Sequence, residues 1–335
     1  MRLLALPITL ALCAASLPAA AVGLRDRLYD PGGGVLVVAH RACHRAAPSH
    51  GFEHGVPENS LAALERCVAL GVDLVEIDVR RTRDGQLVVM HDARVDRTTD
   101  GKGRVADLTL AEIQTLRLKD EGRAGGSEAP PTLEAVLQAA RGRILVNVDL
   151  KGPYAAEAAQ IARRVDATDW VLFKAKARFG APPLADQAPY RDLPFMPMVA
   201  AKAARHAGDL GRITARQASG ARQIPAVEMV SLKRNGFTAV RDAARAARIR
   251  VWTNTLASRG WRGVLDQSGD RKALRDPDKA WGRLINEGVS IVQTDYPAAL
   301  LDYLNRRGLR GQAAIAVADA GSPFPASRAG ASRTR

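Results

Sequence analysis

The chain is poor in aromatic side chains, since phenylalanine, tryptophan and tyrosine together make up 4% of its 335 residues. A surface that stacks nucleic-acid bases needs more of them. Long apolar runs are also missing beyond the first 21 residues, whereas a membrane-spanning helix needs about 20 consecutive apolar residues. These two absences argue against a nucleic-acid-binding protein and against a bilayer span in the main part of the chain.

Acidic residues are outnumbered, and the formal net charge is +14. The excess is mostly arginine, and it is spread along the whole chain rather than gathered in one helix or arm. We therefore expect no nucleic-acid partner. The charge would instead favour phosphorylated substrates and peripheral contact with an anionic membrane surface.

Cysteine is scarce as well, with three in the chain. Cys13 lies in the N-terminal apolar stretch, which leaves Cys43 and Cys67. An exported location would permit a disulfide between them. However, Cys67 is expected on a helix more than two turns below its start, and Cys43 in a loop near that start. We expect them to be too far apart to pair, and Cys67 to pack as a small apolar side chain.

The N-terminus has the order of features found in secretory signal peptides. Arg2 is followed by the uncharged apolar stretch Leu3–Leu17, and then by Pro18 and three alanines. The apolar stretch is short for a membrane span, although a retained anchor is the alternative. We predict a signal peptide over residues 1–21 and an exported protein, periplasmic or secreted.

Short β-branched apolar runs alternate with helical patterns along the rest of the chain. Near-continuous apolar runs suit strands that are buried on both faces, as in a parallel sheet. Eight such strands alternating with helices predict an α/β fold, a closed (β/α)8 TIM barrel over residues 22–310. An open doubly wound sheet is the alternative, but no glycine fingerprint for a dinucleotide follows the first strand. The predicted barrel strands are Val35–Ala39, Leu74–Val79, Ile144–Leu150, Trp170–Phe173, Phe195–Val199, Val227–Leu232, Arg250–Thr255 and Ser290–Thr294.

One further strand does not fit this alternation. Leu87–His91 follows the second barrel strand after the turn Asp84-Gly85, which is a strong hairpin signal. We predict an extra antiparallel strand there. Centring the hairpin on the turn places His91 roughly opposite Asp78.

Two excursions and a tail complete the predicted organisation. Residues 92–131 form a small insertion, in which Thr109 to Glu112 has the pattern of a capping box at a helix start. Residues 257–280 separate the last two strands. Residues 311–335 are rich in alanine, glycine, serine and arginine, and we predict a disordered tail.

Polar residues gather at the C-terminal ends of the predicted strands, where a (β/α)8 barrel carries its active site. Three of them are carboxylates, which offer the oxygen ligands that Mg²⁺ and Ca²⁺ prefer. Two histidines near a metal can share the roles of general base and general acid. An arginine and a lysine can hold an anion, so the combination suggests metal-assisted hydrolysis of a phosphoester. The residues are His40, Arg41, Glu76, Asp78, His91, Asp149 and Lys151.

These residues stand in motifs that resemble the signature of the glycerophosphodiester phosphodiesterase family. The resemblance spans nearly the whole predicted mature chain, with the motifs in order. It implies metal-dependent hydrolysis of a small-molecule glycerophosphodiester to sn-glycerol 3-phosphate and an alcohol. The motifs are His40-Arg41, Pro57-Glu58-Asn59-Ser60, Glu76-Ile77-Asp78-Val79, Asp84-Gly85, His91-Asp92, Arg97-Thr98-Thr99, Asp149-Leu150-Lys151, Val251-Trp252-Thr253-Asn254 and Thr294-Asp295.

The resemblance also implies the catalytic and metal-binding roles. His40 and His91 would be the acid–base pair. Glu76, Asp78 and Asp149 would hold the divalent metal, Mg²⁺ or Ca²⁺. The family more often has glutamate at the position of Asp149, so the shorter side chain could alter the preferred ion.

The remaining site residues would contact the substrate. By the same resemblance, Arg41 and Lys151 would bind the phosphate. Glu58, at the start of the first helix, would make polar contacts or bind metal. Trp252 would line the pocket and pack against the alcohol portion of the substrate.

The sequence departs from the family pattern in two places before the first helix. Ala42 stands where glycine usually follows His-Arg, and the loop Cys43–Val56 is longer than usual. That loop carries His44, His50 and His54. We expect it to be solvated, with a second metal site as the less favoured alternative.

Two other functions stay open at this point. One is a phospholipase, including a lysophospholipase D-like enzyme, which an apolar collar with Phe52 and Trp261 would favour. The other is a non-catalytic phosphate-binding barrel, which the loss of a histidine or a metal-binding carboxylate would have favoured. Both histidines and all three carboxylates are present, and the sequence sets no oligomeric state.

Overall fold

The computed structural model describes residues 19–120, 127–257 and 269–311. Its barrel strands are β1 (Leu36–Ala39), β2 (Leu74–Arg81), β4 (Leu145–Leu150), β5 (Val171–Lys176), β6 (Phe195–Ala200), β7 (Ala226–Val230), β8 (Arg250–Asn254) and β9 (Ile291–Thr294). All eight are parallel, in the order β1-β9-β8-β7-β6-β5-β4-β2, and β1 also pairs with β2. The ring is therefore closed, and the predicted (β/α)8 barrel is confirmed.

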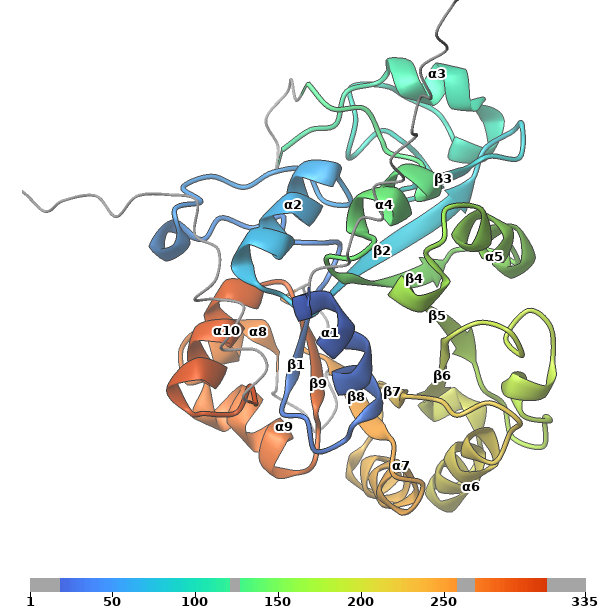
Figure 1. Ribbon diagram of the computed structural model, residues 1–335, viewed down its shortest axis with the longest axis vertical. Coiled ribbons are helices and arrows are strands. Elements are labelled where there is room, and N and C mark those ends of the chain that lie inside the picture. The colour runs from blue at the N-terminus through green and yellow to red at the C-terminus, as the bar shows by residue number, and fades with distance from the viewer. Residues whose placement is uncertain (1–18, 121–126, 258–268, 312–335) are drawn as a thin grey trace, which may run out of the picture.

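Helices surround the barrel (Figure 1). Each of the predicted apolar runs lies on a barrel strand, so the alternation of strands and helices in the sequence was interpreted correctly. The helices are α1 (Ala19–Tyr29), α2 (Leu61–Leu70), α3 (Leu110–Thr115), α4 (Leu133–Ala140), α5 (Ala155–Arg164), α6 (Ala207–Ala218), α7 (Arg234–Ala246), α8 (Asp270–Ala273), α9 (Arg283–Asn286) and α10 (Pro297–Arg306).

The extra strand β3 (Leu87–Val89) pairs antiparallel with β2, as predicted. Its register differs by one residue from the expected one, because Asp78 accepts a backbone hydrogen bond from Met90 rather than lying opposite His91. The turn closes between Thr82 and Gln86, so three residues and not two form the loop. Gly85 supplies the left-handed backbone (φ 81°) that such a loop needs.

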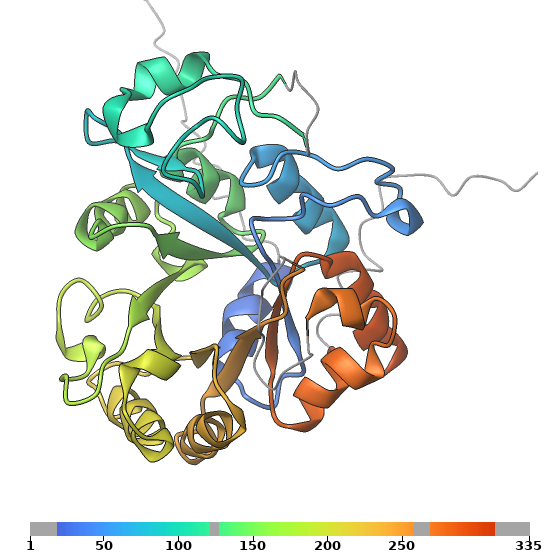
Figure 2. The same ribbon diagram turned by 180° about the vertical axis from the view of Figure 1, so that it is seen from behind.

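The insertion after β3 has a small core of its own. Thr109 accepts a hydrogen bond from the Glu112 backbone at the start of α3, and Glu112 accepts one from the Thr109 backbone, which confirms the capping box. Figure 2 shows the insertion beside α2, on the side of the barrel away from α6 and α7. Its buried apolar residues are Val88, Met90, Val95, Val105 and Ile113.

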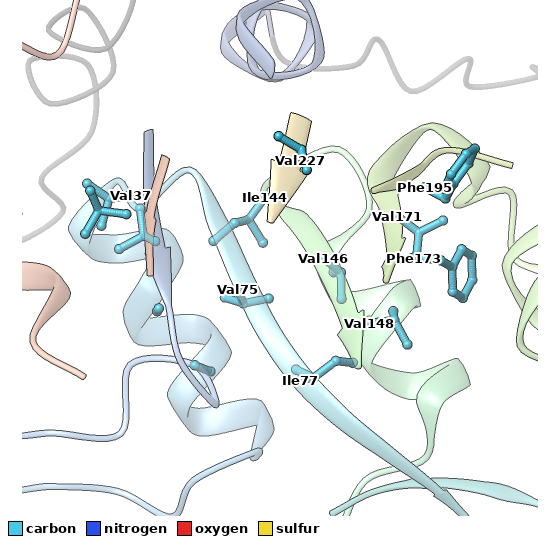
Figure 3. Close-up of a cluster of buried hydrophobic side chains, with 14 of the residues drawn as sticks. Val37, Val75, Ile77, Ile144, Val146, Val148, Val171, Phe173, Phe195 and Val227 are labelled. Atoms are coloured by element: carbon cyan, nitrogen blue, oxygen red, sulfur yellow. The ribbon is translucent and has the colours of Figure 1, made fainter. Parts of the chain in front are cut away.

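The main apolar core lies between the strands and the outer helices. Alternate residues of each strand, such as Val75 and Ile77 of β2 and Val146 of β4, point into it (Figure 3). The other residues of each strand face the inside of the barrel. The helix α1 covers the N-terminal end of the barrel, where Leu28 joins the interior cluster and Arg250 donates hydrogen bonds to the Arg27 carbonyl.

Several predictions fall on residues outside the described part of the chain. Residues 1–18 of the predicted signal peptide and residues 312–335 of the predicted tail are among them, as is Trp261. Among the described residues, no helix is long and apolar enough to span a membrane.

The prediction that Cys43 and Cys67 stay unpaired is wrong, because the structure joins them in a disulfide. The loop after β1 runs back along α2 instead of leaving its start. The Cys43 backbone donates a hydrogen bond to the Ala63 carbonyl, so the two cysteine Cα atoms are 5.2 Å apart. The buried loop backbone, which the sequence does not reveal, brings the pair together.

Removal of this disulfide is expected to lower the free energy of unfolding by about 3 kcal/mol, because the cross-link closes a loop of 24 residues in the unfolded chain. The measurement is urea unfolding of wild type and of the Cys43→Ala/Cys67→Ala variant, with and without reductant. Reductant should lower the stability of the wild type alone. Equal stability of both proteins in both conditions would contradict the prediction.

Candidate active site

The inward-facing side of each strand changes from apolar to polar along its length. Leu74 of β2 packs in the barrel interior, and Glu76 and Asp78 follow on the same side. This change occurs at the C-terminal ends of the strands, as in other barrels of this kind. The pairs, with the interior apolar residue first, are Val38 and His40, Leu145 and Asp149, Leu172 and Lys174, Ala226 and Glu228, Trp252 and Asn254, and Ile291 and Asp295.

Three carboxylates meet at this end of the barrel. Glu76 and Asp78 lie two residues apart on β2, and the parallel register places Asp149 of β4 directly beside Asp78. One oxygen from each of the three side chains lies within 4.8 Å of the others. A donor set made only of carboxylate oxygens fits a hard divalent cation, so the structure brings together the three residues predicted to bind metal.

Two lysines neutralise this carboxylate group. The Lys151 Nζ lies 2.7 Å from an Asp78 oxygen and 2.8 Å from an Asp149 oxygen. The Lys174 Nζ lies 3.5 Å from Glu76 and 3.8 Å from Glu228. The prediction that Lys151 reaches the site is consistent with this geometry.

Burial and these charges act in opposite directions on ionisation. Burial would raise the pKa of Asp78, but Lys151 and His91 outweigh it and hold that pKa at about 2. Burial would likewise lower the pKa of Lys174, but Glu228 and Glu76 outweigh it and raise it. Asp78 is therefore ionised and Lys174 charged at neutral pH.

Lys174 and Glu228 were not among the predicted site residues. Both are buried in the middle of short apolar strands, Lys174 in β5 and Glu228 in β7. A charged residue inside an apolar run was the signal that could have identified them, because such a residue needs a partner in the barrel.

His40 is held by an aspartate that follows β9. The His40 Nδ1 lies 2.6 Å from an oxygen of Asp295, whose other oxygen accepts the Ala257 backbone N–H at 2.8 Å. Burial would raise the pKa of Asp295, but His40 and the Ala257 N–H hold it well below its usual range. Because an ionised carboxylate only accepts hydrogen bonds, we assign the proton to Nδ1, which leaves Nε2 as the acceptor.

Asp270 binds the backbone of Asp295 and so helps to fix its position. It is fully buried, and one of its oxygens accepts hydrogen bonds from the hydroxyls of Thr255 (2.6 Å) and Thr294 (2.8 Å). Its other oxygen accepts the Asp295 backbone N–H at 2.8 Å. Asp270 thus joins the ends of β8 and β9 next to Asp295, the residue that binds His40.

Asp270 should make stability depend on pH. Burial raises its pKa from 3.8 to about 7. The native state therefore keeps a proton that the unfolded state releases, and the free energy of unfolding should fall as pH rises from about 4 to 7. The loss is on the order of 4 kcal/mol. Urea unfolding at pH 5 and pH 7.5 should show a shallower pH dependence for Asp270→Asn than for wild type, and Asp166→Asn, whose side chain is 95% exposed in the wild type, serves as control. Equal pH dependence in wild type and Asp270→Asn would contradict this.

His91 also has an aspartate partner. Its Nδ1 lies 2.7 Å from Asp92, and its backbone carbonyl accepts hydrogen bonds from the Arg80 guanidinium at 2.8 and 2.6 Å. Arg97 in turn binds Asp92. The second histidine is thus oriented by the same kind of partner as the first.

Glu58 lies between two guanidinium groups. Arg41 donates to it at 3.0 Å, and Arg97 donates at 2.7 and 3.0 Å. Burial would raise the pKa of Glu58, but Arg97 and Arg41 lower it. The structure therefore shows Glu58 in polar contacts that hold Arg41 at the rim.

The backbone after β1 takes an unusual conformation. Arg41, Ala42 and Asn59 all have positive φ angles, of 54°, 63° and 59°. This explains why glycine suits the position of Ala42, since an alanine there costs about 1 kcal/mol. Asn59 uses its side chain on Asp78, donating to the carboxylate at 2.9 Å and accepting from the backbone at 3.1 Å.

Trp252 does not lie where it was predicted. It is fully buried in the barrel interior, and its Nε1 donates to Asn254 at 2.9 Å. It precedes Asn254 by two residues on the inward side of β8, so it belongs to the apolar layer below the rim. A substrate alcohol at the rim could not pack against it.

The loop Cys43–Val56 is mostly solvated, as predicted, except at its start. His44 is buried, and its Nδ1 lies 3.2 Å from the Ala42 carbonyl oxygen. His50 lies beside Asp302. Among the described residues, the single group suited to a metal is the one formed by Glu76, Asp78 and Asp149.

A cavity of about 390 Å³ lies beside His40. Its described lining comes from the loop after β1, from the insertion, and from Ala257, Arg271 and Asp295. Its walls are mostly polar. The lining residues are His40, Arg41, His44, Arg45, Glu58, Arg97, Thr98, Lys119, Ala257, Arg271 and Asp295.

Residues 40–178 match the model of the glycerophosphoryl diester phosphodiesterase family, and this segment contains both histidines and all three carboxylates. This part of the chain, less than half of its length, is thus similar to the family. Residues 195–304 match a second model, described as a domain of unknown function. The described site residues from the last strands of the barrel, including Asp270 and Asp295, thus lie outside the first match.

Individual members of the family show the same partial similarity in sequence, and solved structures show the same fold. The chain is 43% identical to the glycerophosphodiester phosphodiesterase of Caldanaerobacter subterraneus over 118 residues, which are 35% of this chain and 45% of that protein. The alignment thus spans less than half the length of this relative. The whole barrel resembles a glycerophosphoryl diester phosphodiesterase from Parabacteroides distasonis, with 22% identity, a TM-score of 0.61 and coverage of 86% and 92%. It also resembles an Oleispira antarctica phosphodiesterase solved with the product sn-glycerol-3-phosphate, with 21% identity, a TM-score of 0.55 and coverage of 81% and 97%.

Proposed function

We propose that the chain hydrolyses glycerophosphodiesters to sn-glycerol 3-phosphate and an alcohol, with a divalent cation. The observation that carries the proposal is the group of Glu76, Asp78 and Asp149, within 4.8 Å of one another at the same rim as His40 and Lys151. The Oleispira antarctica phosphodiesterase, which has a barrel of the same fold, was solved with its product sn-glycerol-3-phosphate, and this is the product that we propose for the present chain.

The cation would be held by Glu76, Asp78 and Asp149. When bound, it would neutralise negative charge on the phosphoryl oxygens. Lys151 and Arg41 would bind the phosphate, since both already lie against Asp78. We propose Mg²⁺ or Ca²⁺, because both prefer oxygen ligands.

The two histidines would move the protons. Each has its Nδ1 against an aspartate, Asp295 for His40 and Asp92 for His91, so each presents Nε2 for chemistry. One Nε2 would accept a proton from the attacking water or substrate hydroxyl. The other would donate a proton to the leaving oxygen, so that the alcohol departs neutral.

Turnover of glycerophosphocholine by the purified protein, after chelation and with Mg²⁺ or Ca²⁺ restored, tests this proposal. Release of glycerol 3-phosphate should require the added cation. Tight metal binding without turnover of any phosphodiester would reject the enzyme and favour a phosphate-binding barrel.

The structure does not favour the phospholipase alternative. Phe52, one of the two aromatics considered for an apolar collar, packs under the Arg66 guanidinium at 5.0 Å. Among the described residues, the exposed large apolar side chains are Phe179 and Leu274 alone. Lysophospholipid assayed beside glycerophosphocholine separates the two activities.

We also propose that the protein is exported, to the periplasm or the medium. The N-terminal order of charge, apolar stretch and small residues supports this. The disulfide between Cys43 and Cys67 is a second support, since such bonds persist in oxidising compartments. Fractionation of cells that express the full chain tests it, and recovery of uncleaved protein in the cytoplasm would reject it.

A further inference from the structure

The cavity beside His40 receives cations from two excursions of the barrel. Lys119 comes from the insertion after β3, and Arg271 comes from α8 in the segment between β8 and β9. The two residues are far apart in the sequence, yet both line the same cavity as His40.

These two cations differ from Arg41 and Arg97, which line the same cavity. Arg41 and Arg97 are bound to Glu58. The Lys119 Nζ instead donates to the Asp96 backbone carbonyl at 3.3 Å, and the Arg271 Nε donates to the Ala257 carbonyl at 3.0 Å. Within the part of the chain that the structure describes, neither side chain forms a salt bridge with a carboxylate.

The described lining of the cavity is electropositive. Its lining contains five arginines or lysines and two carboxylates, Glu58 and Asp295. Clefts lined by one sign of charge concentrate ligands of the opposite sign. A volume of about 390 Å³ lies in the range of small-molecule sites, about 300–1,000 Å³.

The cavity is adjacent to the metal-binding carboxylates but distinct from them. None of Glu76, Asp78 and Asp149 lines it, and neither does Lys151. A phosphodiester whose phosphorus lies at the carboxylate group would therefore extend one substituent past His40 into the cavity. A cationic substituent such as choline would be repelled there by the positive charges of Lys119 and Arg271.

We propose that this cavity binds a second phosphate on the substrate, with Lys119 and Arg271 as its specificity-determining residues. The proposal rests on the proposed hydrolase function and names its substrate class: glycerophosphodiesters whose alcohol portion itself carries a phosphate. Ammonium and guanidinium groups donate charge-assisted hydrogen bonds to phosphate oxygens, and these are the stronger class of hydrogen bond.

The test compares two substrates that differ by one glycerophosphate unit. Bis(glycerophospho)glycerol carries a second phosphodiester in its alcohol portion, whereas glycerophosphoglycerol carries none, and glycerophosphocholine is the cationic comparison. For wild type, kcat/KM should be about 10-fold or more higher with bis(glycerophospho)glycerol than with glycerophosphoglycerol. The Lys119→Gln/Arg271→Gln variant should bring this ratio close to one. The matched control is Lys202→Gln/Arg212→Gln, at two exposed positions that do not line the cavity, and it should keep the wild-type ratio.

The outcomes of these assays distinguish the second phosphate site from the hydrolase function. A wild-type ratio near one, or a ratio that survives in the Lys119→Gln/Arg271→Gln variant, would overturn the second phosphate site and leave the proposed hydrolase intact. Absence of turnover with all three substrates would reject the hydrolase. In that case calorimetric binding of bis(glycerophospho)glycerol decides: affinity about 10-fold weaker in the variant than in wild type supports the site, and equal affinity overturns it.

Discussion

Replacement of Asp78 by asparagine is expected to lower kcat/KM for a glycerophosphodiester roughly 10³-fold or more. The change removes one oxygen of the metal-binding group and leaves Lys151 and Arg41 facing a neutral amide in a buried site. A loss of about 4 kcal/mol in stabilisation of the transition state corresponds to this factor. Metal affinity should fall with activity, because the amide removes one negative charge from the group of oxygen ligands.

Steady-state kinetics and calorimetric metal titration check this expectation. Asp166→Asn is a matched control, since the Asp166 side chain is 95% exposed and lies away from the rim. The control should keep wild-type kinetics and metal affinity. A variant at Asp78 that folds, as judged by its melting curve, and still binds metal with wild-type affinity would show that the ion lies elsewhere.

Replacement of His40 by alanine is the second large effect, a fall in kcat/KM of about 10²- to 10⁴-fold. His40 faces the cavity and has its Nδ1 fixed by Asp295, so its loss removes one of the two groups that move protons. Asp295→Asn should have a smaller effect, because the ring remains but loses its orienting carboxylate. His50→Ala, at the loop histidine beside Asp302, is the control and should be neutral.

A substrate with an easily expelled alcohol assigns the role of His40. A glycerophosphodiester of 4-nitrophenol needs little protonation of its leaving oxygen. If His40 is the general acid, the alanine variant should lose much less activity with this substrate than with glycerophosphocholine. An equal loss with both assigns His40 as the base and His91 as the acid, and no loss with either removes His40 from the reaction.

The sequence was most informative where two simple rules determine the position of a side chain. These are the two-residue alternation of side chains along a strand and the common direction of parallel strands. Glu76 and Asp78 are two apart in an apolar run, so they had to share one side of a strand, and both proved to face the barrel interior. The hairpin after β2 was also predictable from Asp84-Gly85, although the three-residue loop moved the register by one residue.

The sequence was least informative where contacts depend on the path of an irregular backbone or on the depth of a side chain. Cys43 reaches Cys67 because the loop after β1 turns back along α2. Trp252 is inward-facing, as its motif suggested, but it lies one layer below the rim. Lys174 and Glu228 were overlooked for a related reason, since their pairing joins different strands across the barrel interior.

The sequence by itself thus determined the barrel, the extra strand and the identity of the rim carboxylates and histidines. These follow from local periodicity, strand direction and the rule that parallel strands end at a common edge. The tertiary structure alone decided the partners: Asp295 for His40, Asp270 beneath Asp295, and the joint presence of Lys119 and Arg271 in one cavity. The physical reason is that these contacts join segments that are far apart in the chain. Their geometry depends on how the loops pack over the end of the barrel, and no local sequence pattern determines that packing.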